Sequence, residues 1–446
     1  MTSDDLFTPI FVPQAVRDAA SGRAWLQALL DAERALAVAE ARKGAIPAAA
    51  AERIAACCEA ERFDPAVIAE DGRRVGNPAE PLVRALRAAA GDEAGRYVHF
   101  GATSQDIVDT AAVLVSRRVL ELVLADLDGV AAACAALAER HAATPMVART
   151  LLQQALPTTF GLKAAGWLVA VVDARRRLAE VRDRLPAQLG GAAGTLASLG
   201  ERGPETVRLF AAELGLREPD VPWHTARTPL AELAGALDLA AGTLGKVALD
   251  VALLAQTEVG EVAEGDEGRG GSSTLPHKRN PLGATLTIAC ARQVHGHASV
   301  LAGALVQEHE RAAGAWHSEW LALTGALELT GGAARWARET LESLEVDPAR
   351  MRANLDATGG LIMAEAVAFV LADRIGLPEA QRLVGAACRR AVESGRPLRD
   401  ELAADPAVAA ELSAAEIDAA LDPTRYAGSA AAFVERALAR FRGDSA

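Results

Sequence analysis

The placement of proline limits the middle of this chain to long helices. Three long intervals contain no proline, and they lie between Pro81 and Pro145, between Pro229 and Pro276, and between Pro281 and Pro348. Because proline breaks helix interiors, each interval can hold long helices. In residues 109–143, leucines and valines recur at three- and four-residue steps, which is typical of a helix buried along one face. Several such helices predict a central bundle.

Composition favours the same fold class. The chain is 51% hydrophobic but only 4% aromatic, so its apolar mass is mostly Ala, Leu and Val, and Ala and Leu are strong helix formers. A chain of 446 residues is too long for one compact core. We therefore predict an all-α protein of three domains. They are an N-terminal helical domain (1–98), a central helix-bundle domain (99–340) and a C-terminal helical domain (341–446), which begins near a helix start at Asp347 and Pro348.

Charge and targeting signals narrow the function classes. The net charge of -13 argues against nucleic acid or an anionic membrane as the main partner, so an anionic substrate would need a local positive site. The N-terminus has no signal-peptide pattern, and the longest apolar stretches, such as Gly166–Val172, are far shorter than a membrane span. The five cysteines form no CxxC pair. We predict a cytoplasmic protein with no membrane or nucleic-acid partner.

The histidines do not indicate a metal site. The chain has eight of them, without an HExxH motif or a Cys/His ligand spacing. His295 and His297 are two residues apart, so on a helix they would face different ways. We predict that the chain binds no metal.

A polar turn opens the longest expected helix. It lies within Tyr97–Thr110 and contains His99, Thr103 and Ser104. Its hydroxyls have two possible roles. They can cap the helix, or, together with the exposed N–H groups of a helix start, they can bind a carboxylate.

Two further segments carry polar side chains that can bind a ligand. Met146–Gly161 contains Gln153, and on a helix its amides would usually be solvated. Gln307–Trp320 contains Arg311. Ion pairs along an exposed helix would explain this charge equally well.

The most distinctive segment is GRGGSSTLPHKRNP, residues 268–281. By composition alone it could be a surface loop. It matches every fixed position of the pattern Gly-Ser-Ser-x-x-Pro-x-Lys-x-Asn-Pro, and so resembles the signature of the fumarase/aspartase superfamily. YVHFGATSQD and RTLLQQALP stand where that superfamily has its first two active-site segments. VPWHTAR, QEHER and LDPTRY are similar to one branch, the bacterial 3-carboxy-cis,cis-muconate cycloisomerases.

The resemblance implies a chemistry and a set of site residues. Superfamily members make or break a bond β to a carboxylate by returning or removing a proton at the adjacent carbon. Without that proton the carbon is an anion. This anion is stable enough to form only if the neighbouring carboxylate takes the charge, as an aci-carboxylate held by fixed hydrogen-bond donors. The implied catalytic residues are Ser272, which transfers the proton, and Lys278. The implied substrate-binding residues are His99, Thr103, Ser104, Gln153, Ser273, Asn280 and Arg311. The resemblance also implies a small polycarboxylate substrate, no metal or organic cofactor, and a homotetramer whose active sites are shared between subunits.

Two positions depart from the superfamily pattern. Many of its lyases place a histidine and a glutamate where this chain has Leu151 and Thr285. That pair helps to protonate a poor leaving group, whereas a carboxylate, with a pKa of roughly 4, is already ionised and needs no such help. The departure therefore favours intramolecular lactonisation of 3-carboxy-cis,cis-muconate to 4-carboxymuconolactone, as in the protocatechuate branch of the β-ketoadipate pathway.

Other functions stay open at this point. A fumarate-forming lyase that releases a weakly basic group such as nitrite would suit the same departure. An argininosuccinate- or adenylosuccinate-type lyase suits it less well. A structural protein that retained the bundle and lost catalysis is disfavoured, because Ser272, Lys278 and Asn280 are all present.

Overall fold

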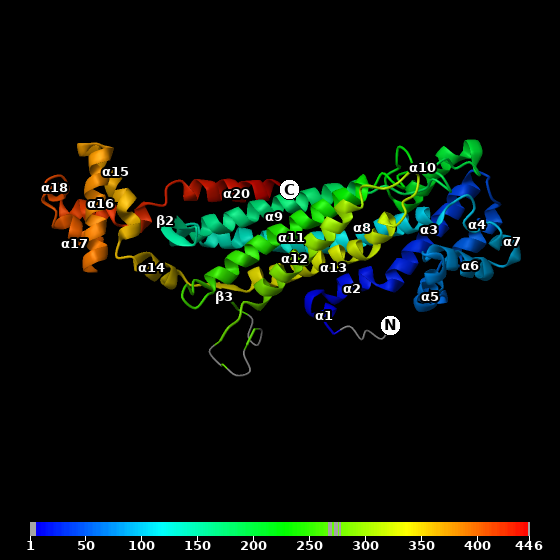
Figure 1. The fold of residues 1–446 in the computed structure, drawn as a ribbon, viewed down its shortest axis with the longest axis horizontal. Coiled ribbons are helices and arrows are strands. Elements are labelled where there is room, and N and C mark those ends of the chain that lie inside the picture. The colour runs from blue at the N-terminus through cyan, green and yellow to red at the C-terminus, as the bar shows by residue number, and fades with distance from the viewer. Residues whose placement is uncertain (1–5, 266–269, 272–274, 276–277, 445–446) are drawn as a thin grey trace. The chain divides into compact units, whose positions relative to one another are not determined.

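The computed structural model describes residues 6–265, 270–271, 275 and 278–444. These residues are mainly helical (Figure 1). The N-terminal helices are α1 (Thr8–Phe11), α2 (Gln14–Ala20), α3 (Gly22–Arg42), α4 (Ala48–Ala55), α5 (Pro65–Val75), α6 (Ala79–Ala90) and α7 (Asp92–Gly95). The middle of the chain forms α8 (Ser104–Arg140), α9 (Phe160–Arg184), α10 (Gly203–Leu214), α11 (Thr228–Leu254), α12 (Leu282–Gly303) and α13 (Ala315–Glu342).

The C-terminal part and the strands complete the fold. The remaining helices are α14 (Pro348–Asp356), α15 (Ala364–Ile375), α16 (Leu377–Ser394), α17 (Leu398–Ala403), α18 (Pro406–Ala409), α19 (Ala414–Ala420) and α20 (Ala430–Asp444). The strands pair antiparallel as β1 (Pro145–Thr150) with β2 (Gln153–Thr159), and as β3 (Val262–Glu264) with β4 (Leu344–Val346). The prediction of an all-α, bundle-based fold is confirmed.

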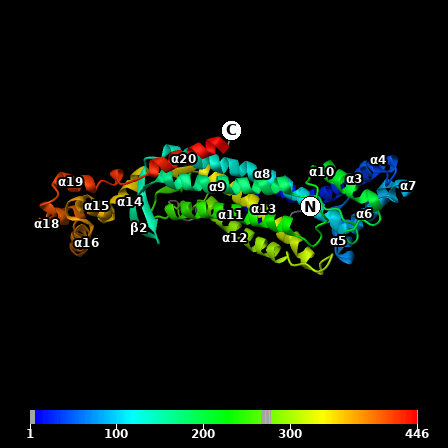
Figure 2. The ribbon, with the colours of Figure 1, turned by 90° about the horizontal axis from the view of Figure 1, so that it is seen from above.

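The chain divides into two compact units made of separate segments. Unit 1 comprises residues 1–128, 173–246 and 286–337, and unit 2 comprises 129–172, 247–285 and 338–446. Within each unit, stretches of the long central helices run side by side (Figures 1 and 2). These helices are α8, α9, α11, α12 and α13. The division into three domains at 98/99 and 340/341 stays a prediction.

Residues 104–128 of helix α8 belong to unit 1, and residues 129–140 belong to unit 2. The helix begins at Ser104, within the polar turn expected to open it, and residues 105–116 are buried on every side. Each polar side chain on a helix that is buried on every side needs a hydrogen-bond partner. This requirement shapes the candidate site described below.

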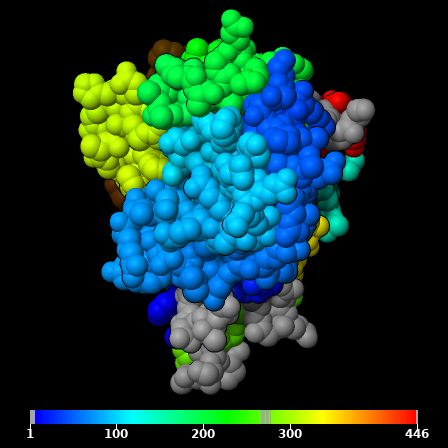
Figure 3. Space-filling model, turned by 90° about the vertical axis from the view of Figure 1, so that its right-hand side faces the viewer, coloured from blue at the N-terminus to red at the C-terminus, as the bar shows by residue number. Residues whose placement is uncertain are grey.

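Helices α3 to α7 and α10 build one end of unit 1. In Figure 3 the N-terminal helices are blue and cyan, and α10 lies beside them in green. α10 packs against α3, whose buried face includes Leu29 and Leu36. α3 also buries two glutamates, Glu33 and Glu40.

The C-terminal helices form a separate hydrophobic core inside unit 2. It includes Val367, Leu371, Leu398 and Leu402, all fully buried. The expected helix start is confirmed, because Asp347 precedes α14 and its side chain accepts a hydrogen bond from the Arg350 amide. No single helix among the described residues is long and apolar enough to cross a membrane. One bent pair, Pro348–Asp356 with Leu361–Ile375, passes that test by length and composition only.

One expectation is wrong. The amides of Met146–Gly161 were expected on a helix, but the segment forms the β1–β2 hairpin. Its threonines and valine favour strands, and Leu151 and Leu152 form a two-residue turn that joins them. The hairpin buries Val147 in a small core of unit 2, where it packs with Leu355, Ile362, Met363 and Ala366.

Candidate functional site

The turn before α8 brings the first predicted residues together. His99, Thr103 and Ser104 lie within six residues of chain in unit 1, and all three are half-buried. The turn is tight, since Gly101 has φ +74° and an added Cβ would lie 3.0 Å from Ser198 Oγ. Only a glycine fits there without strain. The two hydroxyls therefore stand at the start of a long helix, where the helix dipole favours an anion.

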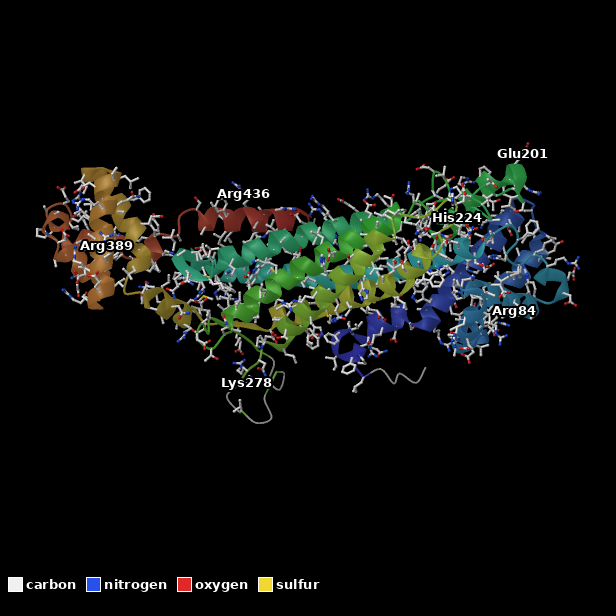
Figure 4. The ribbon with its side chains drawn as sticks, viewed as in Figure 1. Arg84, Glu201, His224, Lys278, Arg389 and Arg436 are labelled. Carbon is white, nitrogen blue, oxygen red and sulfur yellow. The ribbon has the colours of Figure 1, made fainter. Side chains whose placement is uncertain are left out.

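Asp106 holds this turn in place. Its carboxylate accepts hydrogen bonds from the amides of Thr103 (2.9 Å), Gly190 (2.8 Å) and Gly191 (2.9 Å), and from His224 Nε2 (2.7 Å). Asp106 is fully buried, and burial of an unpaired carboxylate would be costly. The four hydrogen bonds offset this desolvation cost. His224 lies inside unit 1 (Figure 4) and contributes to the site by positioning Asp106.

One turn further along α8, Asp109 joins a buried ion network. Arg227 donates to Asp109 at 2.6 and 2.9 Å and to Glu319 at 2.9 and 2.5 Å, and it is 1% exposed. Trp316 Nε1 also donates to Asp109, at 2.9 Å. Burial alone would lower the pKa of Arg227, but the two carboxylates outweigh it and raise the pKa. The network ties α8, the start of α11 and α13 together beneath the turn.

Arg311 lies near the same turn. Its guanidinium donates to Gln105 Oε1 at 3.0 Å and to the Ala192 carbonyl at 2.9 Å. Gln105 in turn donates to the His224 carbonyl at 2.8 Å. The predicted contact of Arg311 with substrate stays a prediction, and in this structure the side chain braces the loop that follows α9.

His99 has one strong partner. Its Nδ1 lies 2.6 Å from Glu33 Oε1 on α3, and Glu33 is buried. Burial by itself lowers the pKa of His99, but the charge and hydrogen bond of Glu33 and the charge of Asp106 outweigh it. Arg87 opposes them, and the net effect is a raised pKa.

The second predicted segment lies in unit 2. Gln153 is exposed at the start of β2, directly after Leu151 and Leu152, which are 96% and 77% exposed. Both leucines have positive φ, +51° and +65°. Arg149, earlier in the same hairpin, makes a bidentate salt bridge to the buried Glu261 at 2.9 and 2.7 Å. Arg149 therefore anchors the hairpin to its own unit.

The signature segment is closed at its base. The Asn280 amide and its Nδ2 both donate to the Gly270 carbonyl, at 3.1 and 2.8 Å. An added Cβ on Gly270 would lie 2.3 Å from the Asn280 carbonyl oxygen, so this approach requires glycine. Glu264 accepts hydrogen bonds from the Gly283 and Ala284 amides and so caps α12. These hydrogen bonds fix Asn280 against Gly270, and they fix the start of α12 against Glu264.

Lys278 is exposed in this segment, outside the helices (Figure 4). Ser272 and Ser273, the predicted proton-transfer and substrate-binding serines, lie outside the described residues. Thr285 is exposed on α12, and its hydroxyl donates to the Pro281 carbonyl at 2.7 Å. Lys278 and Asn280 belong to unit 2, whereas His99, Thr103, Ser104 and Arg311 belong to unit 1. Their shared role in one site stays a proposal.

Sequence reasoning missed the buried supports of the turn. Glu33, Asp109, Arg227 and Glu319 are far apart in the chain, and each alone resembles a solvated charge. Polar residues inside an otherwise apolar helix, as in SQDIVDT, were the available signal. Among the described residues, no group of three or more His, Cys, Asp or Glu side chains could hold a metal ion. The prediction that the chain uses no metal stays a prediction.

The chain matches two protein-family models. One, described as Lyase, covers residues 13–296, and the other, described as Adenylosuccinate lyase C-terminus, covers residues 360–437.

Similar proteins match over nearly the whole chain. A 3-carboxy-cis,cis-muconate cycloisomerase of Pseudomonas aeruginosa is 51% identical over 442 residues, covering 98% of this chain and 96% of the relative. A nitrosuccinate lyase of Streptomyces davaonensis is 48% identical over 445 residues, covering 97% and 94%. The crystal structure of 3-carboxy-cis,cis-muconate lactonizing enzyme from Pseudomonas putida has a TM-score of 0.93 and 47% identity, covering 99% of this chain and all of the other (100%).

Proposed function

Because the chain belongs to the fumarase/aspartase superfamily of lyases, we propose that it catalyses the lactonisation of 3-carboxy-cis,cis-muconate. The chain is an enzyme of the lyase class. The observation that carries the proposal is the 51% identity to a cycloisomerase over 98% of the chain. The substrate is a small carboxylate.

The reaction is an addition across a conjugated double bond. One carboxylate oxygen of the substrate forms a C–O bond to a carbon of the double bond, and the displaced electron pair moves onto the neighbouring carboxylate. The resulting aci-carboxylate then takes one proton at carbon to give 4-carboxymuconolactone. No oxidant, reductant or organic co-reactant is needed, so the protein only has to orient the substrate and stabilise charge.

Each predicted residue has a role in that scheme. Ser272 transfers the proton to carbon, and Lys278 offsets the charge of the aci-carboxylate. The remaining carboxylates are held by the substrate-binding set, His99, Thr103, Ser104, Gln153, Ser273, Asn280 and Arg311. The rigid support of the Thr103–Ser104 turn by Asp106 favours this assignment, because pre-organised donors stabilise charge better than donors that must reorient.

Leu151 and Thr285 fit this reaction. Neither can exchange a proton with a leaving group, and a carboxylate nucleophile with a pKa of roughly 4 does not need that exchange. A second candidate is elimination of nitrite from nitrosuccinate. It is favoured by the 48% identity to a nitrosuccinate lyase and suits the same two residues, since nitrite also leaves without protonation.

We further propose a homotetramer with active sites shared between subunits. Large apolar side chains are exposed on the central helices, including Leu239 and Leu249 on α11, Val300 on α12 and Leu321 on α13. Exposed apolar surface of this kind is typical of subunit interfaces. The proposed partners are then the substrate and further copies of the chain, without nucleic acid or membrane, and the proposed location is the cytoplasm.

The test is whether the purified protein bleaches the ultraviolet absorbance of 3-carboxy-cis,cis-muconate without added cofactor. The Ser272→Ala variant should lose turnover by orders of magnitude while its helical circular dichroism is retained, and Ser273→Ala should be milder. An enzyme that is silent on carboxymuconate but releases nitrite from nitrosuccinate would replace the first candidate by the second.

A further inference from the structure

The contact between His99 and Glu33 is built into the fold of unit 1. The 2.6 Å hydrogen bond joins two residues that are 66 positions apart, one in the turn before α8 and one on α3. The Glu33 side chain is 1% exposed, whereas His99 keeps 13% of its side chain exposed. No described residue hydrogen-bonds His99 Nε2. One ring nitrogen is thus engaged inside the protein, and the other has no partner among the described residues.

The backbone of His99 is also unusual. Its φ of +61° lies in the left-handed region, which non-glycine residues rarely adopt, although histidine and asparagine do so more often than most. Such a conformation costs free energy and persists only where surrounding contacts enforce it, which is frequent at functional sites. The Glu33 hydrogen bond is a contact that holds the ring in this position.

The acidic groups around His99 favour its protonated form. Glu33 faces it from α3 and Asp106 from α8, while Arg87 on α6 opposes them. Burial lowers the pKa of the ring, but the two acids prevail and the pKa is raised. A protonated ring with Nδ1–H on Glu33 presents Nε2–H as a charged donor, and charge-assisted hydrogen bonds to carboxylates are among the stronger ones.

A second buried glutamate on the same helix provides a contrast. Glu40 lies seven residues after Glu33, which is close to two helical turns, and it is fully buried. Neither of its carboxyl oxygens has a hydrogen-bond partner among the described residues. Burial, with the nearby charge of Glu33, raises the pKa of Glu40 to about 9, so it is neutral at pH 7.

From this geometry we propose that Glu33 is a positioning residue: it fixes the His99 imidazolium through Nδ1 and directs Nε2–H to a carboxylate of the substrate. The inference rests on the proposed function, in which His99 binds substrate, and it adds a residue that the superfamily signature does not contain. Glu33 itself touches no substrate and acts only through His99.

The informative variant is Glu33→Gln. Glutamine can still accept the Nδ1 hydrogen bond but has no charge, so the pKa of His99 should fall. In the wild type the ring stays protonated to a higher pH than in the variant. The KM for carboxymuconate should therefore rise roughly tenfold at pH 8, the scale of one lost charged hydrogen bond, and return toward the wild-type value at pH 6. The value of kcat should change less.

Glu40→Gln is the matched control. It makes the same chemical change on the same buried face, but its carboxyl is already neutral at pH 7, so neither KM nor its pH dependence should move. His99→Asn keeps a residue that tolerates positive φ and removes Nε2. Combining Glu33→Gln with His99→Asn should add nothing to His99→Asn alone, because the two residues act as a unit.

A substrate-free measurement separates this inference from the proposed function. The His99 ring can be titrated by NMR in intact protein with ¹³C-labelled histidine, and its signal assigned with His99→Asn. Binding of tricarballylate, an unreactive tricarboxylate, can be measured calorimetrically at pH 6 and pH 8.

Support would be a lower His99 pKa and weaker tricarballylate binding at pH 8 in Glu33→Gln but not in Glu40→Gln. Equal titration and equal binding in wild type and Glu33→Gln would overturn the inference, even if lactonisation is observed. Conversely, failure to turn over carboxymuconate would refute the proposed function without altering either measurement.

Discussion

At the residue scale, the candidate site depends on buried charges that are fully paired. Residues 105–116 of α8 are buried on every side, yet they include Gln105, Asp106 and Asp109. Each has hydrogen-bond partners from distant segments, so the desolvation of these groups is offset. Breaking one partner would leave a buried charge without compensation.

Arg227→Met tests this dependence. The substitution leaves Asp109 and Glu319 facing each other without a cation, which should lower the free energy of unfolding by about 3–5 kcal/mol. Urea unfolding followed by circular dichroism, at one protein concentration, would measure it. Arg208→Met is the control, because Arg208 pairs with Glu205 on the exposed surface of α10 and its loss should not be detectable. Equal stability of Arg227→Met and wild type would contradict the proposed role of the network.

At the element scale, the β1–β2 hairpin is the least conventional part of the fold. Two-residue hairpin turns with positive φ at both positions usually contain Asn-Gly or Asp-Gly, but this one contains Leu151 and Leu152. Left-handed backbone costs leucine roughly 1–2 kcal/mol. The leucines are also exposed, so the described chain offers them no compensating burial.

Leu152→Gly should therefore stabilise the isolated fold. Glycine adopts positive φ without strain, and after its own entropy cost the gain should be about 1 kcal/mol, seen as a higher thermal unfolding temperature. The control is Leu321→Gly, which replaces an exposed leucine within α13 and should lower stability by about 1 kcal/mol, because glycine disfavours helix. A loss of stability in Leu152→Gly instead would indicate that Leu152 is buried by another copy of the chain.

At the scale of the whole molecule, charge and apolar surface have different roles. The net charge of -13 favours solubility and repels anions at long range, so an anionic substrate needs local cations, and Lys278 is the proposed one. The apolar side chains exposed along α11, α12 and α13 favour association of several chains.

Light scattering at micromolar concentration should give four times the mass of one chain. Replacing both Leu239 and Val300 by glutamate should reduce that mass, because charges would be buried in the proposed interface. Val392→Glu is the control, since Val392 is also apolar and exposed but lies on α16 rather than on a central helix. A wild-type monomer would contradict the proposed assembly and the sharing of active sites.

Local chemistry determined the elements of this protein that sequence alone could predict. Proline-free intervals and leucine spacing were sufficient to predict long helices, and Asp347 with Pro348 was sufficient to predict the start of α14. These signals act within a few residues. The glycines, serines, lysine and asparagine of residues 268–281 were sufficient to show the resemblance to the superfamily, because a signature is matched within one short segment.

Only the tertiary structure decided which polar residues are buried and with which partners. Glu33 and Glu40 look alike in the sequence of α3, but one meets His99 and the other meets no described partner. Arg227 and Asp109 are 118 residues apart, and the segment around Leu151 forms a hairpin rather than a helix. The physical reason is the same in each case. Burial and pairing depend on which segments pack together, and that is a property of the whole chain rather than of any short stretch.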